Sequence, residues 1–197
     1  FRMLVGLETA DAGKVMLCGT DVTNKPLHAR ARAGLGYLPQ ETTVFRGLSA
    51  EDNLLAVLEA TPLSRRERKA RAAELLSEFG LSHLARSSAE TLSGGERRRL
   101  EIARALATSP RFLLLDEPFT GLDPIAVAEV EKLFVPLARE RGLGLCITDH
   151  AALALLRACD RVYLLYDGQI ASEGTPAEIA ASPFAQQVYL GEGFRLS

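Results

Sequence analysis

The chain has 197 residues, of which 47% are hydrophobic, enough for one core or one core with an added subdomain. Its formal net charge of −2 gives no overall attraction to nucleic acid or anionic lipid. Three cysteines, Cys18, Cys146 and Cys159, lack C-x-x-C spacing, so neither a disulfide framework nor a zinc site is expected, and a reducing cytoplasm fits. No apolar run approaches the roughly 18 residues of a membrane helix, so any membrane contact is expected through a partner.

Two local runs of basic residues stand out against this balance. They span residues 65–69 (Arg-Arg-Glu-Arg-Lys) and 97–99 (Arg-Arg-Arg). Both lie in segments with a helical pattern, where a run of charges usually forms a solvated face. We therefore expect both runs to face solvent.

The first part of the chain alternates between helical and extended patterns. Two elements are expected before residue 20: the end of an apolar helix (1–7), stopped by Gly6, and a short strand (14–18), closed by a turn at Gly19-Thr20-Asp21. A helix beginning at Pro26 (26–33) and a strand (35–38) ending at Pro39-Gln40 are expected to follow.

The pair Gly13-Lys14 does not form a phosphate-binding loop. A loop of the form G-x-x-x-x-G-K-S/T needs a further glycine where Glu8 stands and a Ser or Thr where Val15 stands. We expect this pair to be a turn into a strand. No such loop occurs elsewhere in the 197 residues.

Residues 49–90 show a helical pattern alone. Ser49 and Asp52 resemble a capping box that opens a helix running through Leu58. Four apolar residues at i, i+3, i+4 and i+7 predict a second helix, ended by Gly80; they are Ala72, Leu75, Leu76 and Phe79. We expect a single domain in which a helical subdomain (residues 48–91) interrupts an α/β core (residues 1–47 and 92–197).

Helices and strands alternate again from residue 92 onward. The expected helices span residues 95–107, 124–141 and 151–158, the strands 112–115, 143–148, 161–166 and 169–171, and two short helices open near Thr175-Pro176 and Ser182-Pro183. Such alternation predicts an α/β fold with a mostly parallel sheet covered by helices. Pro136 is expected to kink or divide the long helix.

Two motifs in this half of the chain carry chemistry. The apolar strand at 112–115 ends in Asp116-Glu117, where ligands of α/β sheets collect. Asp116 is placed to reach Mg²⁺, and Glu117 to take a proton from a water that attacks a γ-phosphate. Upstream, Leu92-Ser93-Gly94-Gly95-Glu96 offers a phosphate a hydroxyl, bare N–H groups and a helix N-terminus. Each motif alone also fits a solvated turn or a capped helix, but together they favour a nucleotide site.

Three further residues fit the same site. Gln40 follows a strand and precedes the helical segment, so its amide is placed to sense Mg²⁺ or water and to report to that segment. His150 follows the strand at 143–148, and strand order places it beside Glu117, where it would donate to a γ-phosphate oxygen. Asp123 lies on the turn after Glu117 and also suits the N-cap of the next helix.

With these residues in this order, the chain resembles the ATP-binding subunits of ABC transporters. The matching segments are residues 38–40 (Q-loop), 92–96 (signature), 112–117 (Walker B), 121–123 (D-loop) and 148–150 (switch histidine). The resemblance implies a P-loop NTPase fold that uses ATP and Mg²⁺. It implies catalytic roles for Glu117, His150 and Gln40, metal contacts from Asp116 and Gln40, and ATP contacts from Ser93, Gly94, Gly95, Glu96 and Asp123.

Longer segments narrow the resemblance to the ATPases of lipopolysaccharide export. They include residues 26–32, 36–41, 44–46, 52–54, 92–99 and the tail 189–196. This implies a homodimer on the cytoplasmic face of the inner membrane, with ATP between the Walker motifs of one subunit and the signature of the other. It also implies a transmembrane permease pair, LptF- and LptG-like, that contacts Phe45 and Arg46 in a groove between the core and the helical subdomain. No nucleic acid is expected.

By the same resemblance, Phe1 falls just after the Walker A motif, so the leading strands and the phosphate loop are missing from these residues. The chain is therefore interpreted as truncated and is expected to be inactive by itself. An amino-acid-import ATPase and a binding module without turnover remain alternatives. A DNA-repair or chromosome-structure ATPase needs a long coiled coil between Gln40 and the signature, where only residues 41–91 stand.

Overall fold

The computed structural model describes residues 1–191 and 194. They belong to two compact units, Phe1–Thr148 and Asp149–Ser197, each with buried apolar side chains of its own. Among the described residues, no helix combines the length and the apolar character needed to cross a lipid bilayer. Of the tail 189–196 that carries part of the family resemblance, residues 192, 193, 195 and 196 lie outside this description.

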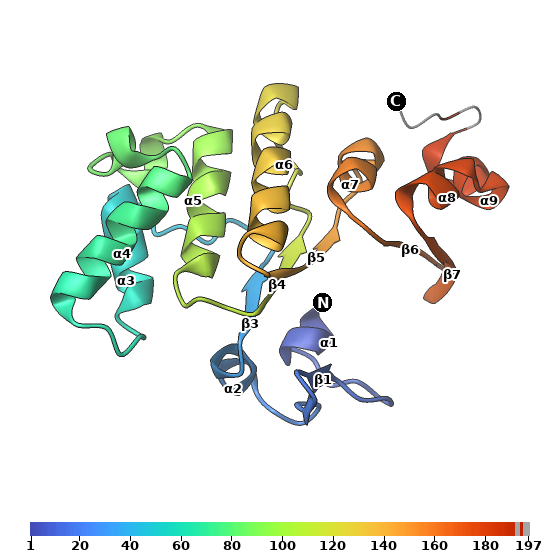
Figure 1. Cartoon of the computed structure of the whole chain (residues 1–197), viewed down its shortest axis with the longest axis horizontal. Helices are drawn as coiled ribbons and strands as arrows, with labels where there is room; N and C mark the ends of the chain where they lie inside the picture. Colours follow the sequence, from blue (N-terminus) through green and yellow to red (C-terminus); the bar gives the residue numbers. More distant parts are fainter. Residues whose placement is uncertain (192–193, 195–197) are drawn as a thin grey trace. The chain divides into compact units, whose positions relative to one another are not determined.

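A three-stranded parallel sheet lies at the centre of the first unit (Figure 1). β4 (Phe112–Asp116) pairs on one side with β3 (Leu35–Leu38) and on the other with β5 (Gly144–Thr148). Residues 113–115 of β4 are buried, as expected of a central strand. Because all three strands run in the same direction, their carboxyl ends meet at one edge. The predicted α/β core with a parallel sheet is confirmed.

Two long helices pack against this sheet and against each other: α5 (Gly94–Leu106), which contacts β3, and α6 (Pro124–Arg139), which contacts β5. The start of α5 comes very close to α6, because a Cβ at Gly95 would lie only 2.9 Å from the Cβ of Ala126. A side chain at position 95 would therefore push the two helices apart.

The helix α6 runs without interruption through Pro136 (Figure 1). The expectation that this proline divides the helix is wrong, and a kink at Pro136 stays a prediction. A proline removes one N–H from the helical ladder. Buried residues on both sides of it, Phe134 and Leu137 among them, hold the flanking turns against the core.

The segment before β3 holds two short helices and a hairpin: α1 (Arg2–Val5), β1 (Met16–Leu17), β2 (Thr20–Asp21) and α2 (Leu27–Arg32). Gly6 ends α1 with a φ of 83°, as predicted. Thr20 and Asp21, expected in a turn, instead form the second strand of the hairpin. The chain already reverses at Cys18 and Gly19, which both have positive φ, so the preceding strand is also shorter than predicted.

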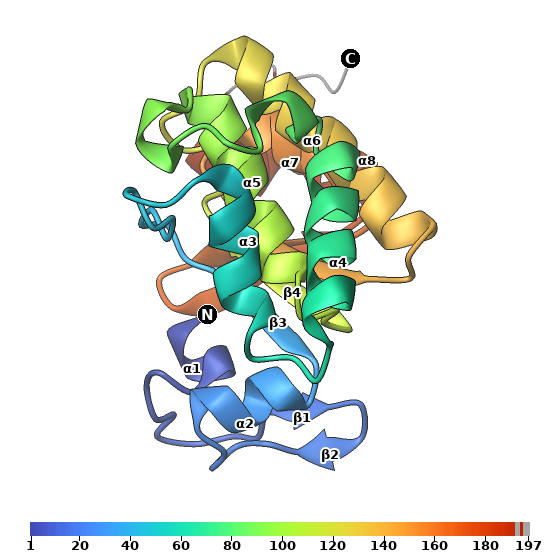
Figure 2. The ribbon, with the colours of Figure 1, turned by 90° about the vertical axis from the view of Figure 1, so that its left-hand side faces the viewer.

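The regular elements of residues 48–91 are all helical: α3 (Ala50–Leu58), α4 (Arg65–Glu78) and the short 3₁₀ turns η1 (Ser82–Leu84) and η2 (Ala89–Thr91). An isolated antiparallel bridge joins Ser49 to Ser88. Figure 2 shows α3 and α4 side by side, and buried leucines from both helices pack between them. The predicted stripe of Ala72, Leu75, Leu76 and Phe79 is buried throughout.

Ser49 caps α3, but the capping box expected there is only half formed. The Ser49 Oγ accepts a hydrogen bond from the Asp52 N–H (3.0 Å). The Asp52 carboxylate accepts from the Ser49 hydroxyl (2.6 Å) and not from its backbone N–H. Aspartate is one methylene shorter than glutamate. At the start of α4 the corresponding residue is Glu67, and there the capping box with Ser64 is complete.

The second unit contains α7 (Ala152–Ala158), β6 (Val162–Tyr166), β7 (Gln169–Gly174), α8 (Pro176–Ala181), α9 (Pro183–Ala185) and the π-helical turn η3 (Gln186–Leu190). β6 and β7 pair antiparallel, so the parallel pattern does not extend to them. The cause is the two-residue turn Asp167-Gly168, in which both residues have positive φ. A small core of Leu156, Leu164, Ile179 and Ala185 holds this unit together.

We predict that Leu75→Ala lowers the free energy of unfolding of the 197-residue protein by about 2–5 kcal/mol, because it leaves a cavity at a fully buried position. Leu7 is 48% exposed, so Leu7→Ala is the matched control and should change that free energy by less than about 0.5 kcal/mol. Urea unfolding followed by circular dichroism measures both. Equal midpoints for the two variants would contradict the burial of Leu75.

Candidate functional site

The carboxyl edge of the parallel sheet brings three of the predicted site residues together. Asp116 ends β4, Glu117 follows it, and Gln40 lies two residues beyond β3. The Gln40 side-chain Nε2 donates a hydrogen bond to the Glu117 Oε2 (2.7 Å). The Thr120 hydroxyl donates to the same oxygen (3.0 Å). The Glu117 carboxylate is therefore oriented by an amide from one loop and by a hydroxyl from the turn that follows β4.

The backbone of Glu117 lies in the left-handed region, with a φ of 47°. This conformation is uncommon for residues other than Gly, Asn and Asp and costs about 1–2 kcal/mol. The Glu117 N–H donates to the Thr148 carbonyl on β5 (2.7 Å), which fixes the turn to the neighbouring strand. Strained backbone held in this way is concentrated at functional sites.

Both carboxylate oxygens of Asp116 accept a hydrogen bond from a hydroxyl. Thr148 Oγ1 donates to Oδ1 (2.6 Å), and the Tyr37 hydroxyl donates to Oδ2 (3.2 Å). Burial, and then the negative charge of Asp116, raise the pKa of Tyr37, so this phenol stays protonated and keeps donating. The carboxylate group is thus held in one orientation at the end of the strand.

The donor set around Asp116 fits a metal–nucleotide complex better than a free metal ion. Within the described residues there is no cluster of three or more His, Cys, Asp or Glu side chains that would hold a cation. Mg²⁺ does not need such a cluster, because it is commonly bound by one or two carboxylates together with substrate phosphates and water. An ionised carboxylate has about four lone pairs, so Asp116 keeps acceptor capacity beside its two hydroxyl partners.

The predicted phosphate-binding helix start is present as a reciprocal cap on α5. The Glu96 N–H donates to the Ser93 Oγ (3.3 Å), and the Ser93 N–H donates to the Glu96 carboxylate (2.8 Å). The hydrogen bond from the Ser93 backbone, followed by that with its side chain, lowers the pKa of Glu96. Ser93 and Gly94 are exposed, so the N-terminus of α5 is open to a ligand, whereas Gly95 is buried against Ala126.

Asp123 caps α6, as one reading of the sequence predicts. Its Oδ1 accepts hydrogen bonds from the N–H groups of Ile125 and Ala126, each at 3.0 Å. The segment around this cap lies against the start of α5, because a Cβ at Gly94 would meet Leu122 at 3.6 Å. The D-loop and the signature, which the sequence presents as separate motifs, therefore lie side by side.

Sequence reasoning missed two residues at the carboxyl edge, Arg98 and Glu101. Arg98, expected to face solvent, is buried with 6% of its surface exposed. Its guanidinium donates to the carbonyls of residues 116–118 and pairs with Glu101 (3.0 Å). The available signal was their opposite charge at a spacing of three on one helix, which indicates a pair but not its burial. The other basic run, 65–69, is exposed as predicted except for the half-buried Arg68.

Phe45 and Arg46, predicted to contact a partner, lie in the loop between β3 and α3. The buried Asn53 fixes this loop, because its side chain accepts from the Phe45 N–H (2.8 Å) and donates to the Phe45 carbonyl (3.0 Å). The Phe45 ring is 50% exposed and lies 4.7 Å from the Arg104 guanidinium. Arg46 is exposed beside it.

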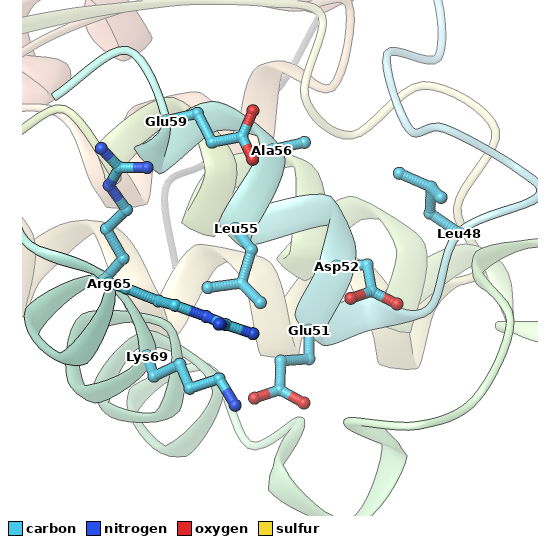
Figure 3. A pocket seen from close by; sticks show the side chains of 9 residues that line it. Leu48, Glu51, Asp52, Leu55, Ala56, Glu59, Arg65 and Lys69 are labelled. Carbon is cyan, nitrogen blue, oxygen red and sulfur yellow. The ribbon is translucent and has the colours of Figure 1, made fainter.

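A groove of about 520 Å³ lies between α3 and α4 (Figure 3). Acidic side chains of α3 form one wall and basic side chains of α4 the other; the lining residues are Leu48, Glu51, Asp52, Leu55, Ala56, Glu59, Arg65, Arg68 and Lys69. Phe45 and Arg46 are not among them. The partner groove expected between the core and the helical subdomain is therefore not this cavity, and it stays a prediction.

His150 belongs to the second unit and precedes α7, where its carbonyl accepts from the Ala152 N–H (2.9 Å). The neighbouring Asp149 is held from two sides: its carboxylate accepts from the Ala151 N–H (2.9 Å), and its carbonyl from the Tyr189 hydroxyl (2.8 Å). The expected position of His150 beside Glu117 stays a prediction.

Comparison with known proteins connects this geometry to a family. Residues 1–120 match the family model described as ABC transporter. The lipopolysaccharide export system ATP-binding protein LptB of Acidithiobacillus ferridurans is 54% identical over 196 residues, which cover 100% of this chain and 81% of the relative. The protein of the same name from Escherichia coli (strain K12) is 50% identical over 197 residues, with the same coverage.

Solved structures give the same assignment. An ATP-binding cassette of an ABC transporter in its ADP conformation matches with a TM-score of 0.84 and 27% identity, covering 97% of this chain and 82% of the other. A dimeric ATP-binding cassette bound to ADP and Pi matches with a TM-score of 0.77 and 27% identity, covering 89% and 78%. The chain therefore belongs to the ABC transporter family of ATP-binding, ATP-hydrolysing proteins.

Proposed function

We propose that this chain is the ATP-hydrolysing subunit of an ABC transporter that exports lipopolysaccharide from the inner membrane. The observation that carries the catalytic part is the Gln40–Glu117 hydrogen bond at the carboxyl edge of the sheet. The transported substrate is supported by relatives at 54% and 50% identity whose names state lipopolysaccharide export. The protein then works at the cytoplasmic face of that membrane and contacts it through its partners.

Glu117 is the proposed general base. A water molecule gives a proton to its carboxylate while the water oxygen bonds to the γ-phosphorus, and the bond from that phosphorus to the bridging oxygen of ADP breaks. Such a base works only in a fixed position relative to the water. Gln40 and Thr120 supply that position, because both donate to the same carboxylate oxygen.

Asp116 is proposed to hold Mg²⁺ together with the phosphate oxygens of ATP and Gln40. The ion, when bound, neutralises charge on the β- and γ-phosphates. The contribution of the chain is orientation, since the hydroxyls of Thr148 and Tyr37 fix both oxygens of Asp116.

The exposed start of α5 is proposed to contact ATP held by a second copy of the chain. The contacts come from Ser93, Gly94, Gly95 and Glu96 and from Asp123 on the adjoining turn. A helix N-terminus favours a phosphate through its free N–H groups and its dipole. A homodimer is supported by the dimeric cassette among the solved relatives. His150 is proposed to donate to a γ-phosphate oxygen.

Phe45 and Arg46 are proposed to contact the permease pair, LptF- and LptG-like. An exposed aromatic ring and an exposed guanidinium stand side by side on a loop that Asn53 holds in place. Aromatic residues and arginines dominate the binding energy of protein interfaces. The site lies on a different loop from the carboxylates, so binding and hydrolysis are separable by mutation.

A polypeptide of these 197 residues is predicted to hydrolyse no ATP above background. It contains no G-x-x-x-x-G-K-S/T segment, so neither backbone N–H groups nor a lysine neutralise the β- and γ-phosphates. Phosphate release from Mg-ATP measures this. Magnesium-dependent turnover that disappears in Glu117→Gln would contradict the prediction.

A chimera tests the role of Glu117. We define the extended protein as this chain preceded by a segment that carries a G-x-x-x-x-G-K-S/T loop, taken from an ATP-binding subunit of an ABC transporter. In it, Glu117→Gln should bind ATP and accumulate closed dimers while turnover falls by about 100-fold or more, because the amide keeps the shape but cannot take the proton. Gel filtration with ATP and phosphate release measure the two properties. Glu140→Gln, at an exposed position, is the control and should keep normal turnover. A Glu117→Gln enzyme that kept a tenth or more of the normal turnover would count against Glu117 as the general base.

Reversing the charge of Arg46 tests the partner surface. Arg46→Asp in the extended protein should weaken co-purification with the permease pair of the organism that encodes this chain. ATP hydrolysis by the extended protein in the absence of the permease should stay unchanged, because the lost contacts lie in an interface. Arg66→Asp makes the same charge change at an exposed position outside the proposed surface and should keep both properties. If Arg46→Asp reduced both activities equally, the loop would belong to the catalytic machinery instead.

A further inference from the structure

One face of α5, the signature helix, is hydrogen-bonded to two segments of the candidate site. They are the turn after β4, which carries Glu117, and the loop after β3, which carries Gln40. Arg98, Glu101 and Arg104 follow one another at a spacing of three, and all three side chains are buried. Each of the three is hydrogen-bonded to backbone or side-chain groups of the segment that follows β3 or β4. Buried charges of this kind are rare unless they are paired.

Arg98 is bonded to three consecutive backbone carbonyls. Its Nε donates to the Pro118 carbonyl (2.9 Å), and its Nη2 donates to the carbonyls of Glu117 (2.9 Å) and Asp116 (3.3 Å). These carbonyls surround the residue whose φ is 47°. The planar fork of a guanidinium can hold several acceptors in one fixed arrangement, which the single ammonium of lysine cannot.

Glu101 connects the same ion pair to the loop that carries Gln40. One carboxylate oxygen accepts from Arg98 Nη1 (3.0 Å). The other accepts from the Thr42 hydroxyl (2.6 Å) and the Thr43 N–H (3.0 Å). The Arg98–Glu101 pair therefore fixes the backbone of Glu117. It also fixes the segment next to Gln40, and Gln40 is the residue whose amide orients the Glu117 carboxylate.

We propose that Arg98 is a positioning residue for Glu117, and that the Arg98–Glu101 pair sets the place of the carboxylate relative to the attacking water. The proposal rests on the proposed role of Glu117 as general base. Arg98 itself donates to protein carbonyls and touches no reacting atom. Its loss is expected to displace the base more than the groups that bind ATP, because its two shorter bonds are to the carbonyls of Glu117 and Pro118 and its longest is to that of Asp116.

The test is Arg98→Lys in the extended protein, which keeps the charge but removes the fork. We expect kcat for ATP hydrolysis to fall by about 100-fold, the loss typical of a base displaced by about 1 Å, while the KM for ATP stays unchanged. Arg99→Lys is the matched control, because Arg99 pairs with Glu129 on α6, and its kcat should stay normal. An Arg98→Lys enzyme with normal kcat, or with KM raised and kcat unchanged, would overturn the proposal.

A double variant separates this proposal from the one on which it depends. If Arg98 acts through Glu117, Arg98→Lys should have no further effect on the residual turnover of Glu117→Gln. Two additive losses would show that Arg98 acts elsewhere and would overturn the proposal even if Glu117 is the base. A Glu117→Gln enzyme with normal turnover would instead overturn the proposed function.

A second variant keeps the test valid if Arg98→Lys does not fold, as judged by circular dichroism and urea unfolding. Glu101→Gln preserves the size of the side chain and weakens the pair. It should lower kcat at unchanged KM and lose this effect in the Glu117→Gln background. A folded Glu101→Gln enzyme with normal kcat would overturn the role of the pair.

Discussion

The candidate site depends on the parallel pairing of β4 with β3 and β5. In this register Leu38 lies opposite Leu115, so Gln40 and Glu117, each two residues further along, come within hydrogen-bond distance. Thr148 lies opposite Asp116, so one residue serves both carboxylate positions: its hydroxyl binds Asp116 and its carbonyl binds the Glu117 N–H. A slip of one residue would turn each of these side chains to the other face of the sheet.

Most elements of the fold follow from patterns that involve near neighbours in the chain. The apolar run that forms β4, the apolar stripe of α4 and the stop at Gly6 depend on periodicity and on one residue's backbone preference, and all three were predictable. The meeting of Gln40 with Glu117 was also predictable, because carboxyl ends of parallel strands share an edge.

The remaining features depend on contacts between distant segments or on local turn geometry. Nothing within the Arg97–Arg99 run distinguishes the buried Arg98 from its neighbours, because its acceptors are carbonyls that follow β4. Thr20 joined a strand and not a turn because the left-handed φ falls on Cys18, which is not a glycine. The place of His150 depends on a relation between two units, which no periodicity encodes.

The reciprocal cap on α5 also fixes the polarity of its exposed end. The Ser93 Oγ accepts from the Glu96 N–H, and the Ser93 side chain is also hydrogen-bonded to the Glu96 carboxylate. The Glu96 carboxylate, the only negative group in this turn, is turned back onto the Ser93 N–H. The one carboxylate of this turn is therefore taken up by the cap, and the exposed end at Ser93 and Gly94 carries the positive end of the helix dipole, which favours an anionic ligand over a cationic one of the same size.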